Sequence, residues 1–167
     1  MKKFFSFLFV ALLPMVASAY FYDSITGYDA MIDGIGYKFS GNNATVSYQW
    51  HEVYEGGEGY YSEYSGDIVI PESVTYNGKT YKVTGIGDNA FDGCGSLTSA
   101  TLPNTITGIG NSAFLGCSSL TSVNLPNAVT RIGYYAFQGC SKLASVNIPE
   151  GVTSVNFGST LRLKKPM

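Results

Sequence analysis

Apolar and polar positions recur with a period of 23 residues across the middle of the chain. Three consecutive copies, 86–108, 109–131 and 132–154, keep the same register throughout. Each copy opens with Ile-Gly-x-x-Ala-Phe-x-Gly-Cys and continues with a leucine, two apolar positions separated by one residue, and a proline. Because the apolar positions return at fixed offsets, the copies predict one local structure repeated three times.

Each copy is predicted to form one coil of a solenoid. A fixed period of about 20–50 residues is typical of solenoids, and a period near 20–29 with Leu-x-x-Leu-x-Leu is typical of leucine-rich repeats. In the second copy Val123 and Leu125 alternate with Ser122 and Asn124, which predicts a strand with one buried face. Stacked coils would pair these strands into a parallel sheet. The predicted fold is therefore a solenoid that is mainly β with short helical turns.

The side chains that return in every copy predict the hydrophobic core. Gly93, Gly116 and Gly139 are placed where a helical turn must reverse, a position that favours a residue tolerating positive φ. The core receives one phenylalanine, one cysteine and one leucine from each copy: Phe91, Phe114, Phe137, Cys94, Cys117, Cys140, Leu97, Leu120 and Leu143.

The Ala-Phe-x-Gly-Cys motif, at 90–94, 113–117 and 136–140, resembles the BspA-like leucine-rich repeat family of bacterial surface proteins and some protist proteins. The resemblance covers about half of the chain. Upstream, 67–74 matches the strand half of a coil, so the solenoid is expected over 67–158, with partial first and last coils. Extra residues before Ile86 contain Asn77-Gly78 between β-formers, which predicts a hairpin with a two-residue type I′ turn.

The first 19 residues are predicted to be a secretory signal peptide. Lys2 and Lys3 precede an apolar run that ends at small residues placed as in an Ala-x-Ala cleavage site. The run is too short to span a membrane, so no membrane span is expected after cleavage. Cleavage leaves eight Lys and Arg against twelve Asp and Glu, a net charge of −4, which disfavours nucleic acid as a partner. The protein is expected to be secreted or held at the cell surface.

Residues 20–66 are predicted to form an N-terminal β cap. Strands are expected around 35–39 and 45–50, with a turn at 40–43, because solenoids need ends that cover their apolar interior. From 51 to 67, glutamates alternate with tyrosines among glycines. This loop is either a solvated connection or a recognition loop in which tyrosines give large contact area. Its candidate contacts are Tyr54, Tyr60, Tyr61 and Tyr64.

The three cysteines have two interpretations. An odd number in an exported chain is typical of a free or intermolecular thiol. Their 23-residue spacing instead places them about 5 Å apart in neighbouring coils, which predicts an internal ladder of thiols packed as small apolar side chains. Neighbouring pairs would also lie within disulfide range. The chain has no Cys-x-x-Cys spacing for zinc.

The sequence does not predict catalysis or a cofactor. Residues 85–90 and 108–113 fit Gly-x-Gly-x-x-Ala, but a dinucleotide site needs a longer βαβ unit than a 23-residue coil provides. The single histidine is not part of a nucleophile motif. A carboxylate pair in the 51–67 loop could serve glycoside hydrolysis, but a glycine-rich loop holds no pair rigidly. The protein is therefore predicted not to be an enzyme.

The outward strand positions predict a binding face. They form two rows of small, uncharged residues, Ser99, Ser122 and Ser145 in one and Thr101, Asn124 and Asn147 in the other. Such a face can bind an extended protein or a glycan, although the same residues also keep a sheet soluble. The resemblance implies adhesion to host matrix proteins or to other cells. We expect an extracellular protein partner; alternatively, the protein is a glycan-binding or glycan-degradation accessory that uses the 51–67 loop on a cell-surface glycan.

The repeat fails at its C-terminal end. Ser159, Thr160 and Leu163 stand where the alanine, phenylalanine and cysteine would recur, so 159–167 is expected to be a frayed tail. The last apolar layer would then have no full coil covering it. Because family members are commonly longer, the chain is either a truncated reading frame or pairs its exposed edge with a partner. We expect self-association through this end. The layer consists of Leu143, Val146 and Ile148.

Overall fold

The computed structural model describes residues 27–48, 64–155 and 163–164, and these residues form thirteen strands joined by turns, with no helix. No segment in these ranges is a helix long and apolar enough to cross a membrane. The predicted signal peptide and most of the 51–67 loop lie outside the described residues.

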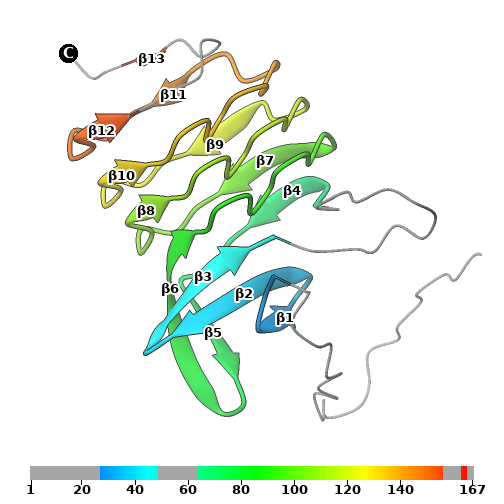
Figure 1. Cartoon of the computed structure of the whole chain (residues 1–167), viewed down its shortest axis with the longest axis vertical. Helices are drawn as coiled ribbons and strands as arrows, with labels where there is room; N and C mark the ends of the chain where they lie inside the picture. Colours follow the sequence, from blue (N-terminus) through cyan, green and yellow to red (C-terminus); the bar gives the residue numbers. More distant parts are fainter. Residues whose placement is uncertain (1–26, 49–63, 156–162, 165–167) are drawn as a thin grey trace, which may run out of the picture.

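An eight-stranded sheet runs along one side of the molecule (Figure 1). From β3 onward its successive neighbours are parallel, and the last three are paired 23 residues apart, with Gly108 beside Arg131 and Arg131 beside Ser154. The strands in spatial order are β1 (Ala30–Ile32), β2 (Ile35–Ser40), β3 (Asn43–Ser47), β6 (Lys79–Ile86), β8 (Gly108–Ile109), β10 (Arg131–Ile132) and β12 (Ser154–Val155), with β5 (Ser73–Tyr76) paired to β6.

Shorter parallel sheets run along the other side of the coils (Figure 1). One contains β4 (Gly66–Val69), β7 (Leu97–Thr101) and β9 (Ser122–Asn124), and the other contains β11 (Val146–Asn147) and β13 (Leu163–Lys164). Ser99 pairs with Ser122, which is the parallel register that the repeat predicts. β11 lies next to β9, but the strand pairing is interrupted between them.

The Ala-Phe-x-Gly-Cys segments differ from the expected helical turn. Alternate backbone N–H groups donate to the following coil, as Phe91 N does to Ala113 O and Phe114 N to Ala136 O, both at 2.8 Å. An α-helix requires those groups to donate four residues back along the same segment. Each segment also contains a glycine of positive φ, such as Gly116 at 70°, and follows a residue of positive φ, such as Ser112 at 52°. The coil therefore turns through tight, non-helical corners that are hydrogen-bonded to their neighbours.

The predicted core residues lie inside the coils. The phenylalanines form a continuous stack, with ring centroids 4.9 Å apart between Phe91 and Phe114 and 5.3 Å apart between Phe114 and Phe137. All three have no exposed surface. The cysteines and leucines at the other repeated core positions are also buried.

Threonine hydroxyls add a further set of contacts between coils. Thr107 Oγ1 donates to Thr84 O at 3.2 Å, and Thr130 Oγ1 donates to Thr107 O at 3.3 Å. On the other side of the coil, Thr121 Oγ1 donates to Thr98 O at 3.0 Å. Each bond joins residues 23 apart, so successive coil interfaces repeat the same contact.

The cysteines are buried thiols, and no disulfide joins them. Cys117 Sγ donates to Phe91 O at 3.0 Å, and Cys140 Sγ donates to Phe114 O at 3.1 Å. The pKa of the Cys117 thiol is raised. The largest cause is its interaction with the Cys140 thiol, followed by that with the Cys94 thiol and by burial. Since the thiolate is the reactive form, both effects protect this residue.

We expect alkylation of the native protein to be slow at all three cysteines, and slowest at Cys117. Iodoacetamide labelling followed by mass spectrometry at neutral pH measures this, with the denatured protein as the control that labels fully. Rapid labelling of the three residues without denaturant would contradict the buried ladder.

The N-terminal strands continue the sheet of the solenoid. The predicted hairpin is present as β2 and β3, and β3 pairs in parallel with β6. The predicted type I′ turn joins β5 to β6, with φ of 49° at Asn77 and 74° at Gly78. Sequence reasoning missed β1, although Asp33-Gly34 carries the same turn signal, with φ of 50° and 79°.

The expectation that residues 159–167 form a frayed tail over their whole length was wrong at β13. β13, within 159–167, pairs in parallel with β11, so that Val146 lies beside Leu163. This spacing is shorter than the 23-residue repeat, and the sequence after Val155 has no Ala-Phe-x-Gly-Cys motif. The predicted uncovered layer, Leu143, Val146 and Ile148, is buried. Self-association through this end stays a prediction, but it no longer follows from an exposed core.

Candidate binding face

The two predicted rows lie on the outward face of β7, β9 and the region around β11. Strand pairing places Ser99 beside Ser122 and Thr101 beside Asn124. Thr101, Ser122, Asn124 and Asn147 are exposed, whereas Ser99 and Ser145 are half-buried. This surface, called the polar face below, presents hydroxyl and amide groups without a charged side chain among the six.

Asp67 of β4 extends the serine row and was missed by sequence reasoning. It pairs with Ser99 in the sheet. Thr98 Oγ1 and Ser99 Oγ each donate to Asp67 Oδ1 at 2.7 Å. Both hydrogen bonds lower the pKa of the Asp67 carboxyl, and the one from Thr98 has the larger effect. The in-register segment 67–74 was the signal that could have found this residue, because it places Asp67 at an outward strand position.

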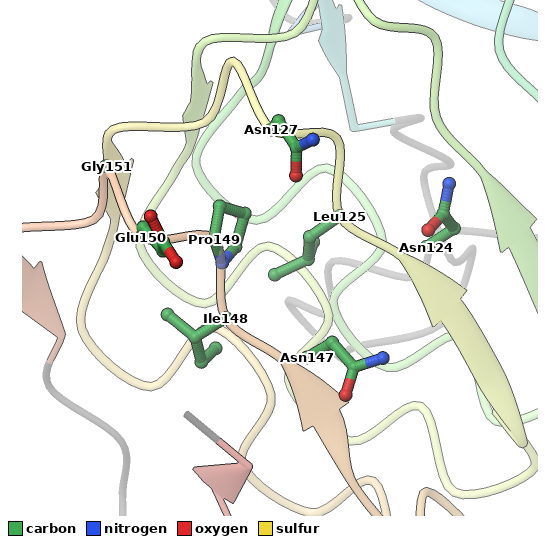
Figure 2. Close-up of a pocket in the computed structure, with 8 residues that line it drawn as sticks. All are labelled: Asn124, Leu125, Asn127, Asn147, Ile148, Pro149, Glu150 and Gly151. Carbon is green, nitrogen blue, oxygen red and sulfur yellow. The ribbon is translucent and has the colours of Figure 1, made fainter. Parts of the chain in front are cut away.

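A groove with a volume of about 630 Å³ lies at the other end of the polar face. Figure 2 shows apolar side chains at its centre and amide and carboxylate groups around them. Asn124 and Asn147, both predicted contact residues, belong to its lining. The full lining is Asn124, Leu125, Asn127, Asn147, Ile148, Pro149, Glu150 and Gly151.

The groove lies where the pairing of the strands is interrupted. Its two walls are the segments that follow β9 and β11, which belong to separate sheets. Pro126 and Pro149 come shortly after these strands, and proline has no N–H to donate to a strand ladder. The side-chain amides of Asn124, Asn127 and Asn147 are exposed on these walls and can reach a ligand.

The tyrosines predicted as loop contacts do not gather at this face. Tyr54, Tyr60 and Tyr61 lie outside the described residues. Tyr64 is buried, with 7% of its surface exposed, and its ring packs edge-on against Phe91 at a centroid distance of 4.9 Å.

The hydroxyl of Tyr64 is used within the fold. Its Oη accepts a hydrogen bond from Gly36 N at 2.9 Å and donates to Ser47 O at 3.2 Å. A side chain that ties the N-terminal hairpin to the phenylalanine stack is not available to a ligand. The expectation of a contact role for Tyr64 was therefore wrong.

The described residues of the polar face offer hydrogen-bonding groups. Across all the described residues, no cluster of three or more His, Cys, Asp or Glu side chains could hold a metal ion. The polar face combines hydroxyl and amide groups, each able to donate and accept hydrogen bonds. Such groups suit recognition of a backbone or of a hydroxylated surface.

Comparison with known proteins agrees with the geometry. The model for the BspA type leucine rich repeat region matches residues 60–161 with six copies. No curated protein sequence matches the chain. Three bacterial proteins are among the solved structures similar to it.

A leucine-rich repeat protein from Bacteroides ovatus is 30% identical, over 75% of this chain and 37% of its own, with a TM-score of 0.54. A leucine rich cell surface protein from Faecalibacterium prausnitzii is 28% identical, over 80% of this chain and 41% of its own, with a TM-score of 0.61. A leucine-rich repeat protein from Bacteroides capillosus is 28% identical, over 82% of this chain and 88% of its own, with a TM-score of 0.61.

The chain spans less than half the length of the B. ovatus and F. prausnitzii proteins. Its 23-residue coils, phenylalanine stack and parallel sheets are accounted for by one kind of repeat, and the family model covers more than half of its residues. The chain therefore belongs to the BspA-type leucine-rich repeat family, whose repeats are protein-interaction modules.

Proposed function

We propose that this chain is an exported adhesion module that binds an extracellular protein through the polar face and its groove. The observation that carries the proposal is the continuity between them: Thr101, Asn124 and Asn147 lead along one row, and the last two line the groove. The F. prausnitzii neighbour, described as a cell surface protein, supports placement of this chain at the surface.

An extended protein segment fits the chemistry of this surface. Each asparagine amide can donate to a peptide carbonyl and accept from a peptide N–H. The apolar centre of the groove, with Leu125, Ile148 and Pro149, can contact one apolar side chain of the segment (Figure 2). Backbone recognition would supply affinity, and the apolar contact would supply preference for a side chain.

We expect the double change Asn124→Ala and Asn147→Ala to weaken binding to an extracellular protein about tenfold. Each lost hydrogen bond costs about 0.5–1.5 kcal/mol, and a factor of ten corresponds to about 1.4 kcal/mol. The protein without residues 1–19 is used to capture host matrix proteins, and the affinity for a captured protein is then measured by surface plasmon resonance.

Two controls separate the polar face from other surfaces. Gln138→Ala removes an exposed amide from the corner between β10 and β11 and should leave binding unchanged. Deletion of residues 52–63 should also leave it unchanged. If the loop deletion abolished binding while the double asparagine variant bound normally, the polar face would not be the binding surface.

A further inference from the structure

The third coil departs from the other two at three neighbouring surface positions. The corner that opens this coil, counted from the residue just before it, carries Arg131, Tyr134 and Tyr135. The first coil has Gly85, Asp88 and Asn89 at these positions, and the second has Gly108, Asn111 and Ser112. Since the same corner is built twice without the arginine and the tyrosines, the solenoid fold does not require them.

The two tyrosines are not packed into the protein. Tyr134 is 59% exposed and Tyr135 is 52% exposed. Tyr135 also has a φ of 58°, in the left-handed region that large side chains rarely adopt. The equivalent residues Asn89 and Ser112 have the same positive φ, so the corner sets this backbone, and only the large aromatic side chain is particular to the third coil.

Two of these residues, Arg131 and Tyr134, lie beside polar groups of the first two coils in one cavity. Its volume is about 260 Å³, and Arg131 and Tyr134 line it together with Asp88 and Asn111. The guanidinium of Arg131 lies over Gly108. A Cβ atom built on Gly108 would be 4.0 Å from Arg131 Nε. The remaining lining residues are Ile109, Gly110, Ile132 and Gly133.

Hydrogen bonds between coils fix the polar side chains of the cavity. Asp88 Oδ1 accepts from Asn111 N at 2.7 Å, and Asn111 Oδ1 accepts from Tyr134 N at 2.9 Å. Each residue thus uses one oxygen to hold the next coil. The second carboxylate oxygen of Asp88, 3.5 Å from Asn111 Nδ2, is left with capacity to accept from a ligand.

We propose that this cavity, called the coil-three cavity below, binds a neutral saccharide. Asp88 can only accept hydrogen bonds and Arg131 can only donate them, and a hydroxyl group can satisfy both because it donates and accepts. The Tyr134 ring provides a flat apolar surface next to them, against which the C–H face of a sugar ring can pack.

The opposite charges of the cavity disfavour simple anions and simple cations. An anion attracted by Arg131 would be repelled by Asp88, and a cation attracted by Asp88 would be repelled by Arg131. The volume of about 260 Å³ is close to the lower end of small-molecule sites, about 300 Å³. The cavity therefore suits one or two rings at the end of a glycan.

The test replaces the third corner with the second one. The triple variant Arg131→Gly, Tyr134→Asn and Tyr135→Ser gives coil three the residues of coil two, so folding should be preserved, and its thermal melting should match that of the wild type. Both proteins are applied to an array that carries neutral oligosaccharides, acidic oligosaccharides and unglycosylated peptides.

We expect the wild type to bind one or more neutral glycans, and the folded triple variant to lose at least tenfold in affinity. Tyr134→Asn alone should lose most of that binding. Asn124→Ala with Asn147→Ala should retain it, because those residues belong to the polar face. Binding to acidic glycans or peptides only, no glycan binding by the wild type, or full binding by the triple variant would overturn the proposal. None of these outcomes affects the test of the polar face.

Discussion

Replacing Phe114 with alanine is expected to lower the free energy of unfolding by about 3–5 kcal/mol. Phe114 is the middle ring of the core stack, with no exposed surface and an aromatic neighbour in each adjacent coil. Removing the ring leaves a cavity that borders both coil interfaces. Urea denaturation followed by circular dichroism measures the change.

Ser122→Ala is the matched control, because Ser122 belongs to the same coil but is exposed on the polar face. Surface changes of this kind usually alter stability by less than about 0.5 kcal/mol. Equal losses of stability in the two variants would show that the phenylalanine stack is not the core of the solenoid.

Gly110→Ala is expected to be the second strongly destabilising change, with a loss of about 1–3 kcal/mol or more from overpacking. A Cβ atom at Gly110 would lie 2.5 Å from Asp88 N and from Gly87 C, which are backbone atoms of the preceding coil. A Cβ atom at Gly133 would clash in the same way with Asn111 N and Gly110 C, which are backbone atoms of the second coil. Coils can approach this closely only because a glycine occupies the position.

The control for Gly110→Ala is Gly95→Ala in the first coil. A Cβ atom at Gly95 would lie 3.5 Å from Ser118 Oγ, an ordinary contact, and its φ is not in the left-handed region. Stability should change little in this variant, as measured by the same urea titration. A Gly110→Ala protein as stable as the Gly95→Ala protein would refute the close approach of the coils.

This close approach explains a pattern that the sequence could show but not explain. The apparent dinucleotide fingerprint arises because the second glycine of each Gly-x-Gly is needed where two coils touch. The first glycine has no such role, and coil three has Arg131 in its place. A nucleotide-binding motif and a coil contact can have the same residue pattern, and only the spacing to the next strand distinguishes the two.

The fold could be predicted wherever contacts repeat with the period of the sequence. The pairing of Ser99 with Ser122 and the Phe114 stack follow directly from the 23-residue period. The strand β13 could not be predicted, because its spacing from β11 breaks that period. Tyr64 was misjudged because the composition of its loop concealed that this residue already packs on Phe91.

The candidate sites were predicted only in part, for a related reason. Rows such as Thr101 and Asn124 follow from strand alternation. The groove depends on the interrupted pairing between β9 and β11, whose local sequences match those of the paired strands. The coil-three cavity combines Asp88, Asn111 and Tyr134 from three successive coils, and only the stacked structure brings them together.

The identical hydrogen bonds from Thr107 to Thr84 and from Thr130 to Thr107 have an evolutionary consequence. Because these threonine contacts recur at the same offset, recombination between copies of the repeat could insert or delete a whole 23-residue unit and keep the same contact at the new junction. The polar face would then grow or shrink by one strand at a time. Ligand specificity could diversify in such a lineage through unequal crossing-over, in steps that leave the stability of every remaining interface unchanged.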